Sequence, residues 1–185
     1  MGEHTRAALQ HVLEDAELLH DAAAVRLALD RMAAAISTEL ADTHPVVLCV
    51  LTGGIIPTGH LLTRLTFPLE IDYLHATRYR GTTQGEHVQW VCRPETSLQD
   101  RTVLVVDDIL DEGHTLADVL AFCRDAGAAQ VYSAVLVEKQ HARRDAAVTA
   151  DYVGLSVEDR YVFGFGMDYR GHFRNLDGIY AVANR

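Results

Sequence analysis

The sequence is short of positive charge and of cysteine, and each shortage excludes a class of protein. Sixteen lysines and arginines stand against 26 aspartates and glutamates, which gives a formal net charge of −10. A broad nucleic-acid surface needs clustered cations to neutralise phosphates, so none is expected. Cys49, Cys92 and Cys123 lack the paired spacing of a disulfide framework or a metal site, which predicts free thiols.

Long apolar runs are also missing. No stretch of the sequence approaches the length that crosses a membrane. The N-terminus lacks the basic start and apolar core of a secretion signal. We therefore expect a cytoplasmic protein with neither a membrane nor a nucleic-acid partner.

What is present is typical of a globular α/β protein. With 185 residues, 49% of them hydrophobic, the chain fits a single domain over 1–185. Apolar runs predict strands at 46–51, 69–74, 88–91, 102–106 and 130–137. Helices are expected at 5–40, with Asp21 as an N-cap, and at 57–65 and 114–126. Such alternation favours a mostly parallel sheet covered on both faces, and short strands at 152–155, 160–163 and 179–182 predict an appended lobe or a sheet edge.

The strand at 102–106 runs directly into an acidic segment, residues 107–115 (DDILDEGHT). In open α/β sheets, ligands bind beyond the carboxyl ends of the strands. The adjacent carboxylates of Asp107 and Asp108 can accept ribose hydroxyl protons or position a hydrated Mg²⁺, which prefers oxygen ligands. The turn from Glu112 to Thr115 can present backbone N–H groups to a phosphate at a helix start.

Two other interpretations fit parts of this segment. Acidic residues at a strand end are often solvated caps, but Gly113 and Thr115 on the same turn fit phosphate binding, which weakens that interpretation for the set. An Asp-Asp pair after a strand is also typical of phosphoacceptor receiver domains. Those domains carry the pair early in the chain, whereas here it begins at residue 107 of 185.

Four segments, in this order, carry a family resemblance. They are 51–54 (LTGG), 105–116 (VVDDILDEGHTL), 152–154 (YVG) and 160–176, which includes RYVFGFGMDY and HFRNL. Together they resemble the pyrophosphate loop, the donor signature and the base-binding segment of type I phosphoribosyltransferases, in particular the hypoxanthine-guanine subgroup. The resemblance covers about residues 45–180. It implies an α/β fold with a central, mostly parallel sheet and a small base-binding lobe from about 150–185.

The resemblance implies transfer of a phosphoribosyl group from Mg²⁺-bound 5-phosphoribosyl 1-pyrophosphate to hypoxanthine or guanine, with IMP or GMP and pyrophosphate as products. Asp107 and Asp108 would contact the ribose hydroxyls, directly or through metal-bound water. Asp111 would face the purine N7 and accept its proton. The 5′-phosphate would be wrapped by Asp111, Glu112, Gly113, His114 and Thr115.

The resemblance also implies which residues bind the leaving pyrophosphate. Thr52 and Gly53 would receive it, and the peptide between them can be cis in this family. Arg174 would also contact pyrophosphate and neutralise its charge. Asp168 would help to hold Mg²⁺ together with the acidic pair.

The base and the closing loop complete the implied site. Tyr161 would stack on the purine, and Val162 would meet the ring edge through its backbone. Arg78 and Tyr79 would lead a loop, over about 78–86, that closes on the reacting centre. Closure keeps out the water that would hydrolyse the donor.

Three positions depart from the family pattern. Thr52 stands where lysine is common, and Glu112 stands where threonine is usual. Thr149 occupies the position, three residues before the Tyr-Val-Gly segment, at which we expect a lysine that recognises the purine 6-oxo group. The possible substitutes are Lys139, Arg143 and Arg144. The same reaction on another base, such as xanthine, therefore stays an alternative.

A second alternative belongs to another functional class. A regulatory protein can use this fold to sense the donor while it binds RNA or DNA. The net charge of −10 and the lack of a basic cluster count against it. Because members of the family usually assemble, we expect a homodimer or homotetramer.

Overall fold

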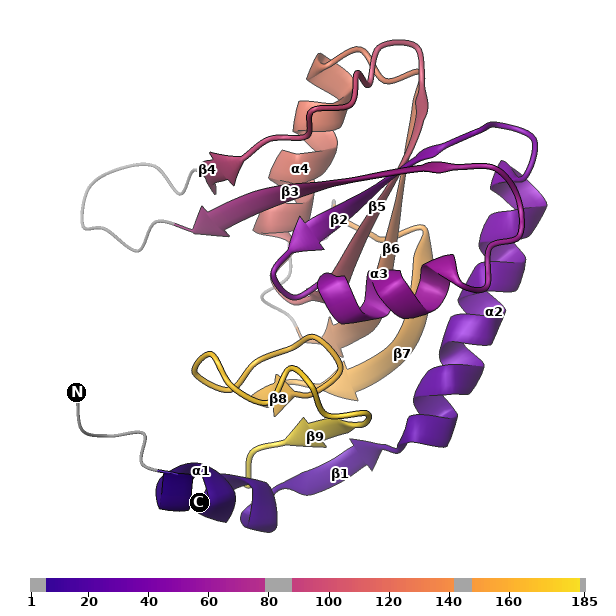
Figure 1. Cartoon of the computed structure of the whole chain (residues 1–185). Helices are drawn as coiled ribbons and strands as arrows, with labels where there is room; N and C mark the ends of the chain where they lie inside the picture. The colour runs from indigo at the N-terminus through magenta and orange to yellow at the C-terminus, as the bar shows by residue number, and fades with distance from the viewer. Residues whose placement is uncertain (1–5, 79–87, 142–147, 184–185) are drawn as a thin grey trace.

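Two β-sheets of unequal size organise the described part of the chain (Figure 1). The computed structural model describes residues 6–78, 88–141 and 148–183. The helices are α1 (Arg6–Asp15), α2 (Ala22–Leu40), α3 (Ile55–Leu62) and α4 (His114–Asp125). The strands are β1 (Glu17–His20), β2 (Val46–Leu51), β3 (Glu70–Arg78), β4 (Val88–Cys92), β5 (Thr102–Leu110), β6 (Gln130–Gln140), β7 (Tyr152–Glu158), β8 (Val162–Phe163) and β9 (Ile179–Ala181).

The larger sheet confirms the predicted α/β architecture. Its order is β4-β3-β2-β5-β6-β7, and all neighbours are parallel except the edge pair of β3 and β4. Leu104 and Val106 of β5 pack into one hydrophobic core, and Val103 and Val105 pack into another. Successive side chains of β5 therefore point to opposite faces of the sheet. Helices α2 and α3 cover the first face and α4 the second (Figure 1). Burial on both faces explains the uninterrupted apolar runs.

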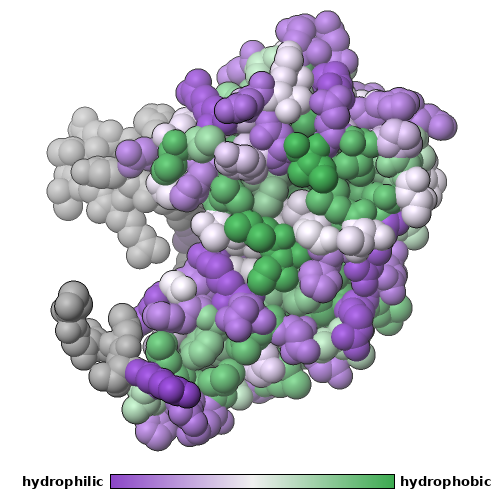
Figure 2. Space-filling model, viewed as in Figure 1, coloured by the Kyte–Doolittle hydropathy of each residue, from purple (hydrophilic) through white to green (hydrophobic). Residues whose placement is uncertain are grey.

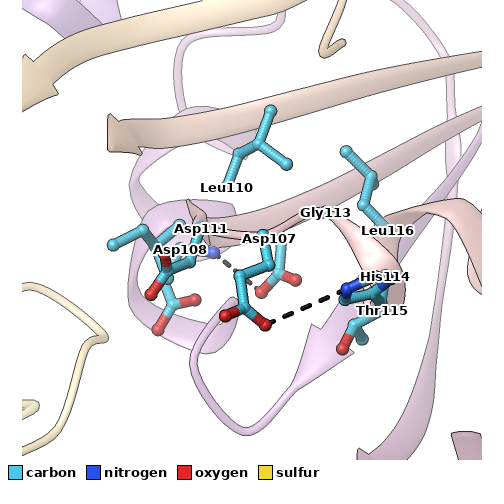
Figure 3. Close-up of a pocket in the computed structure, with 10 residues that line it drawn as sticks. Asp107, Asp108, Leu110, Asp111, Gly113, His114, Thr115 and Leu116 are labelled. Atoms are coloured by element: carbon cyan, nitrogen blue, oxygen red, sulfur yellow. Dashed lines mark hydrogen bonds and ion pairs between the residues drawn. The ribbon is translucent and has the colours of Figure 1, made fainter. Parts of the chain in front are cut away.

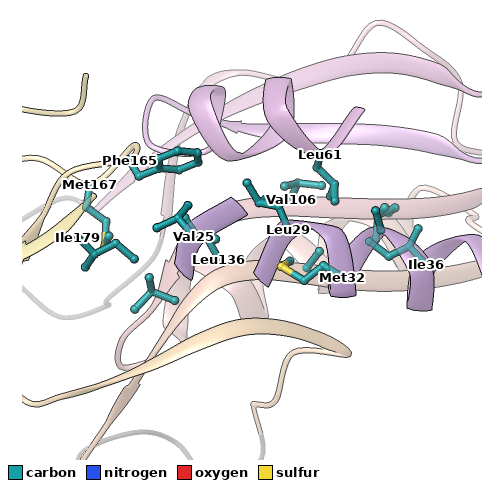
Figure 4. Packing of buried hydrophobic residues seen from close by; sticks show 14 of the residues in the cluster. Val25, Leu29, Met32, Ile36, Leu61, Val106, Leu136, Phe165, Met167 and Ile179 are labelled. Atoms are coloured by element: carbon teal, nitrogen blue, oxygen red, sulfur yellow. The ribbon is translucent and has the colours of Figure 1, made fainter. Parts of the chain in front are cut away.

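Helix α2 buries one apolar stripe. The stripe recurs every three or four residues and consists of Val25, Leu29, Met32, Ile36 and Leu40. It packs with side chains of α3, the sheet and the C-terminal segment (Figure 4). At the helix start, the predicted N-cap is confirmed, because the Asp21 carboxylate accepts the backbone N–H of Ala24 at 2.8 Å.

The helix predicted over 5–40 is wrong in its extent. Helix α1 ends at Asp15, and β1 follows and pairs antiparallel with β9, with Glu17 opposite Ala181. The regular apolar spacing of α2 begins only at Val25, so the segment before it has no buried helical stripe. Pairing with the far end of the chain therefore decided its conformation.

The C-terminal strands divide between the two sheets. β7 pairs parallel with β6 as the edge of the larger sheet, whereas β8 and β9 join β1 in the smaller one. For these strands, a sheet edge and an appended lobe were both expected as alternatives. Both occur, because β7 forms the edge and β8 and β9 belong to the smaller sheet. The C-terminal strands of the smaller sheet follow Glu158. β5 also continues past the predicted end, through the acidic pair to Leu110, because its pairing with β6 persists as far as Glu138.

Two further features concern the membrane spans and the cysteines that were considered from the composition. Among the described residues, no helix is both long and apolar enough to cross a membrane. The three cysteines all lie in this part of the chain and are free thiols, as predicted. Burial raises the pKa of Cys123 to about 11, so this thiol is protonated at neutral pH and behaves as a small apolar side chain.

Candidate active site

The acidic segment at the end of β5 and the turn that follows it line a pocket of about 260 Å³, formed by residues 107–116. The acidic side chains lie on one side of the turn, and Leu110 and Leu116 point to the other (Figure 3). Gly113 precedes α4 with a φ of 92°, in the left-handed region that favours glycine. The first backbone N–H groups of a helix have no partner within it, so the start of α4 is a favourable place for a phosphate.

Asp107 and Asp108 lie side by side, Asp107 partly buried and Asp108 buried. Asp108 is 8% exposed, and its backbone N–H donates to Asp107 Oδ1 at 2.8 Å. Burial raises the pKa of Asp107 well above its usual value, and the charge of Asp108 raises it further. Burial also raises the pKa of Asp108. A cation beside the pair would relieve both effects.

Arg174 connects the acidic pair to the segment after β8. Its Nη2 lies 2.5 Å from Asp168 Oδ1, and its Nη1 lies 3.8 Å from Asp108 Oδ2. The second oxygen of Asp168 accepts the backbone N–H of Gly171 at 2.6 Å. Within the described residues, no three His, Cys, Asp or Glu side chains gather closely enough to hold a metal ion by themselves. Mg²⁺ bound by one or two carboxylates usually keeps several waters and takes substrate phosphate oxygens as further ligands.

The segment after β2 packs directly against the acidic pair. Gly53 is buried, and a Cβ at this position would overlap the Asp108 carboxylate. A Cβ at Gly166 would in turn overlap the Gly53 carbonyl oxygen. A cis peptide bond joins Leu51 to Thr52, so the predicted position between Thr52 and Gly53 is wrong by one residue. Sequence similarity locates this loop but does not define the conformation of its individual peptides.

A larger cavity of about 500 Å³ brings the predicted parts together. Its lining includes Gly53, Asp107, Asp108, Asp111, Thr115, Tyr161, Val162, Asp168 and Arg174. The acidic segment and the aromatic side chain of the lobe therefore open onto one space. Tyr161 is 52% exposed and meets the ring of Tyr169 edge-on at 5.5 Å, which leaves ring surface for a ligand.

Asp111 lies between two basic side chains. Lys139 Nζ donates to Asp111 Oδ2 at 2.7 Å, and His141 Nε2 lies 2.6 Å from Asp111 Oδ1. Burial by itself would raise the pKa of Asp111, but the hydrogen bonds and charges of these two side chains outweigh it and lower the pKa. Lys139 also lines the larger cavity.

Known proteins resemble this chain in sequence and in structure. The model of the phosphoribosyl transferase domain matches residues 15–170. The chain belongs to the phosphoribosyltransferase family. The hypoxanthine-guanine-xanthine phosphoribosyltransferase of Tritrichomonas foetus is 32% identical over 91% of this chain and 92% of that protein. The hypoxanthine-guanine phosphoribosyltransferase of Bacillus subtilis is 31% identical over 80% of this chain and 82% of that protein.

Solved phosphoribosyltransferase structures share the fold. A hypoxanthine phosphoribosyltransferase from Staphylococcus aureus superimposes with a TM-score of 0.87 and 26% identity, covering 97% of each chain. A hypoxanthine-guanine-xanthine phosphoribosyltransferase superimposes with a TM-score of 0.84 and 29% identity, covering 92% of this chain and 99% of that one. The predicted family and fold are therefore confirmed.

Other predicted residues of this phosphoribosyltransferase lie around the two cavities. Glu112, Gly113 and His114 line the smaller pocket, where His114 Nε2 lies 3.9 Å from Glu112 Oε2. Thr52 is exposed and lines a neighbouring cavity of about 370 Å³ together with Arg174. The predicted phosphate and pyrophosphate residues are thus adjacent but do not all face one space.

The predicted closing loop lies almost entirely outside the described residues. Arg78 is the last residue of β3, and Tyr79 is not described, so the closing role of both stays a prediction. Thr149, where a lysine was expected, is exposed, and the larger cavity is lined by Lys139 instead. The other two possible substitutes, Arg143 and Arg144, are also outside the described residues.

A signal for Lys139 was available in the sequence. Lys139 is the only lysine of the chain, in which the other 15 of the 16 Lys and Arg residues are arginine. His141 follows two positions later, and alternate residues of an extended strand point to the same side. Neither feature shows that both side chains meet Asp111, because that contact depends on how β6 pairs with β5.

Proposed function

We propose that this phosphoribosyltransferase transfers the phosphoribosyl group of 5-phosphoribosyl 1-pyrophosphate to hypoxanthine or guanine, forming IMP or GMP and pyrophosphate. The observation that carries the proposal is the cavity of about 500 Å³ shared by Asp108, Asp111 and Tyr161. Asp108 offers a carboxylate for the ribose, Asp111 can accept a proton, and Tyr161 offers an aromatic surface on which a purine can stack. The names of the relatives, which include hypoxanthine and guanine, support the same substrates.

The donor would bind across the acidic segment. The carboxylates of Asp107 and Asp108 would accept hydrogen bonds from the ribose hydroxyls. The 5′-phosphate would occupy the turn from Asp111 to Thr115, where backbone N–H groups at the start of α4 favour an anion. The left-handed conformation of Gly113 supports this role, since it shapes the turn before the helix.

Mg²⁺ fits the acidic pair when the donor supplies further oxygen ligands. The raised pKa values of Asp107 and Asp108 indicate two adjacent carboxylates that lack sufficient compensating charge. When bound, Mg²⁺ would neutralise charge on the departing pyrophosphate. Asp168 would help to hold the ion once Arg174 turns from it toward the pyrophosphate, and Thr52 and Gly53 would receive the leaving group through the backbone.

The base would enter between Tyr161 and Asp111. Tyr161 would stack on the purine, which is worth roughly 1–3 kcal/mol in comparable contacts, and the Val162 backbone would meet the ring edge. Lys139 would donate to the 6-oxo oxygen. Lys139 Nζ contacts Asp111 Oδ2 at 2.7 Å. When the ammonium group turns from Asp111 to the purine, that oxygen becomes free to accept the N7 proton. Loss of this contact also makes Asp111 a stronger base.

The closing loop completes the proposed mechanism. Arg78 and Tyr79 would bring the segment after β3 over the reacting centre. Exclusion of water protects the anomeric carbon, which develops positive charge as pyrophosphate leaves.

We also propose that residues 1–185 form one domain, act in the cytoplasm and associate as a homodimer or homotetramer. The pairing of β1 with β9 supports the single domain. Hydrophobic side chains gather near the centre of one face, over the start of α3 (Figure 2), where Ile55 is 49% exposed. Sedimentation velocity measures the association, and a monomer at micromolar concentration would contradict it.

A panel of free bases tests the function. Hypoxanthine, guanine, xanthine and adenine are incubated with the donor, with Mg²⁺ or with excess chelator, and nucleotides are separated by chromatography. We expect IMP and GMP only with Mg²⁺, and the name of the T. foetus relative makes xanthine the next base to examine. No nucleotide from any base would contradict the proposal, and retained RNA or DNA binding would then favour a donor-sensing regulator.

A further inference from the structure

The two oxygens of the Asp111 carboxylate have different partners. Oδ2 accepts from Lys139 Nζ at 2.7 Å, and Oδ1 lies 2.6 Å from His141 Nε2. A carboxylate only accepts hydrogen bonds, so the imidazole must donate an N–H from Nε2 to Oδ1. The carboxylate is therefore held from both sides.

The two partners differ in their access to the cavity. The His141 side chain is 4% exposed, whereas that of Asp111 is 43% exposed. Among the described residues, Asp111 and Lys139 belong to the lining of the larger cavity and His141 does not. Lys139 can therefore meet a bound base, while His141 meets it only through Asp111.

The backbone accounts for this arrangement. Lys139 lies on β6 and His141 directly follows its end, so alternate side chains point to the same side. β6 pairs in parallel with β5, with Glu138 opposite Leu110. Asp111, the next residue after β5, thus lies where both basic side chains reach it.

We propose that His141 is a positioning residue for proton transfer, an inference that rests on the proposed function. By holding Oδ1 of Asp111, His141 keeps Oδ2 directed at the base after Lys139 turns to the 6-oxo group. In the step itself, the N7–H bond of the purine breaks and an O–H bond forms at Oδ2. The electron pair of the N7–H bond stays on N7, while the N9 lone pair bonds to the anomeric carbon and the bond from that carbon to the pyrophosphate oxygen breaks with its electrons on the oxygen. His141 keeps its own hydrogen.

The role depends on orientation rather than on substrate binding. With Lys139 engaged by the base, His141 is the contact that prevents rotation of the carboxylate about its Cβ–Cγ bond. Misplacement of a reacting group by about 1 Å can cost roughly 100-fold in rate. Loss of the His141 contact should therefore lower kcat and leave the KM of the donor nearly unchanged.

Three substitutions separate positioning from packing. His141→Leu fills the space but donates nothing, and we expect kcat to fall roughly 10- to 100-fold with the donor KM within about twofold. His141→Gln can donate an amide N–H from a similar position, so it should recover most of kcat, whereas the shorter His141→Asn should not. His20→Gln is the matched control, because His20 Nε2 contacts the Ser156 carbonyl at 3.2 Å rather than Asp111.

A double-mutant cycle shows whether His141 acts through Asp111. In the Asp111→Asn background, His141→Leu should reduce kcat no further, since the acceptor is already lost. An equal reduction in both backgrounds would overturn the proposal, as would wild-type kcat in His141→Leu. If the leucine variant does not fold, the glutamine and asparagine variants decide, and equal kcat for these two would overturn it.

The same assays distinguish the two levels of inference. A wild-type protein that makes no nucleotide from any base refutes the proposed function and the positioning role together. Nucleotide formation by the wild-type protein with unchanged kcat in His141→Leu refutes the positioning role alone.

Discussion

Replacement of Lys139 by methionine removes one ammonium group and keeps a side chain of similar length. In the structure that group lies 2.7 Å from Asp111 Oδ2, and the lysine side chain is 11% exposed. The aliphatic part of lysine and the methionine side chain occupy similar volumes, so the cavity should keep its shape. The substitution therefore isolates the donor that we assign to the purine 6-oxo group.

The expected loss follows from the kind of hydrogen bond removed. A hydrogen bond that involves a charged group is worth about 1.5–3 kcal/mol, and each 1.36 kcal/mol corresponds to a factor of ten in rate. We therefore expect kcat/KM for hypoxanthine and guanine to fall roughly 10- to 160-fold. In the variant His141 still contacts Asp111, and the Asp111 side chain is 43% exposed. The carboxylate therefore keeps a partner and access to water, and the variant should fold.

Steady-state kinetics with hypoxanthine, guanine and adenine measure the effect. The loss should fall on the two 6-oxopurines, because adenine offers no carbonyl oxygen, and the donor KM should change little. Lys139 is the only lysine in the sequence, so selective lysine labelling gives a single side-chain NMR signal, which should shift when hypoxanthine binds. An unchanged kcat/KM for hypoxanthine in Lys139→Met would refute the assignment, and so would an unshifted signal at saturating base.

Three further substitutions address the remaining roles. Asp111→Asn should lower kcat by roughly 10²–10⁴ with donor binding retained in calorimetry, and an unchanged rate would remove Asp111 as the proton acceptor. Tyr161→Ala should raise the KM of the base roughly 5- to 160-fold, from about 1–3 kcal/mol of stacking. Tyr161→Phe serves as its control, and equal KM values for the two would place the base elsewhere. Gly53→Ala should cost about 1–3 kcal/mol of stability, because its Cβ would overlap the Asp108 carboxylate, and should weaken donor binding; an unaltered melting temperature would contradict that packing.

Local patterns in the sequence determined much of the fold. The apolar run of β2 is buried along almost its whole length, as its composition predicts for a strand covered on both faces. The cap at Asp21 and the apolar spacing that begins at Val25 mark α2 within a few turns of the sequence. The acidic segment was recognisable because its carboxylates, glycine and hydroxyl lie within nine consecutive residues, 107–115.

Contacts between distant segments were decided only by the tertiary structure. β1 became a strand because β9 pairs with it, and no pattern within Glu17–His20 contains that information. Likewise, the sequence alone pointed to Thr149 for the missing lysine, whereas the register of β6 against β5 brings Lys139 and His141 to Asp111. Local propensity depends on near neighbours in the chain, but a site at the ends of several strands depends on strand order and register, which form only when the whole sheet assembles.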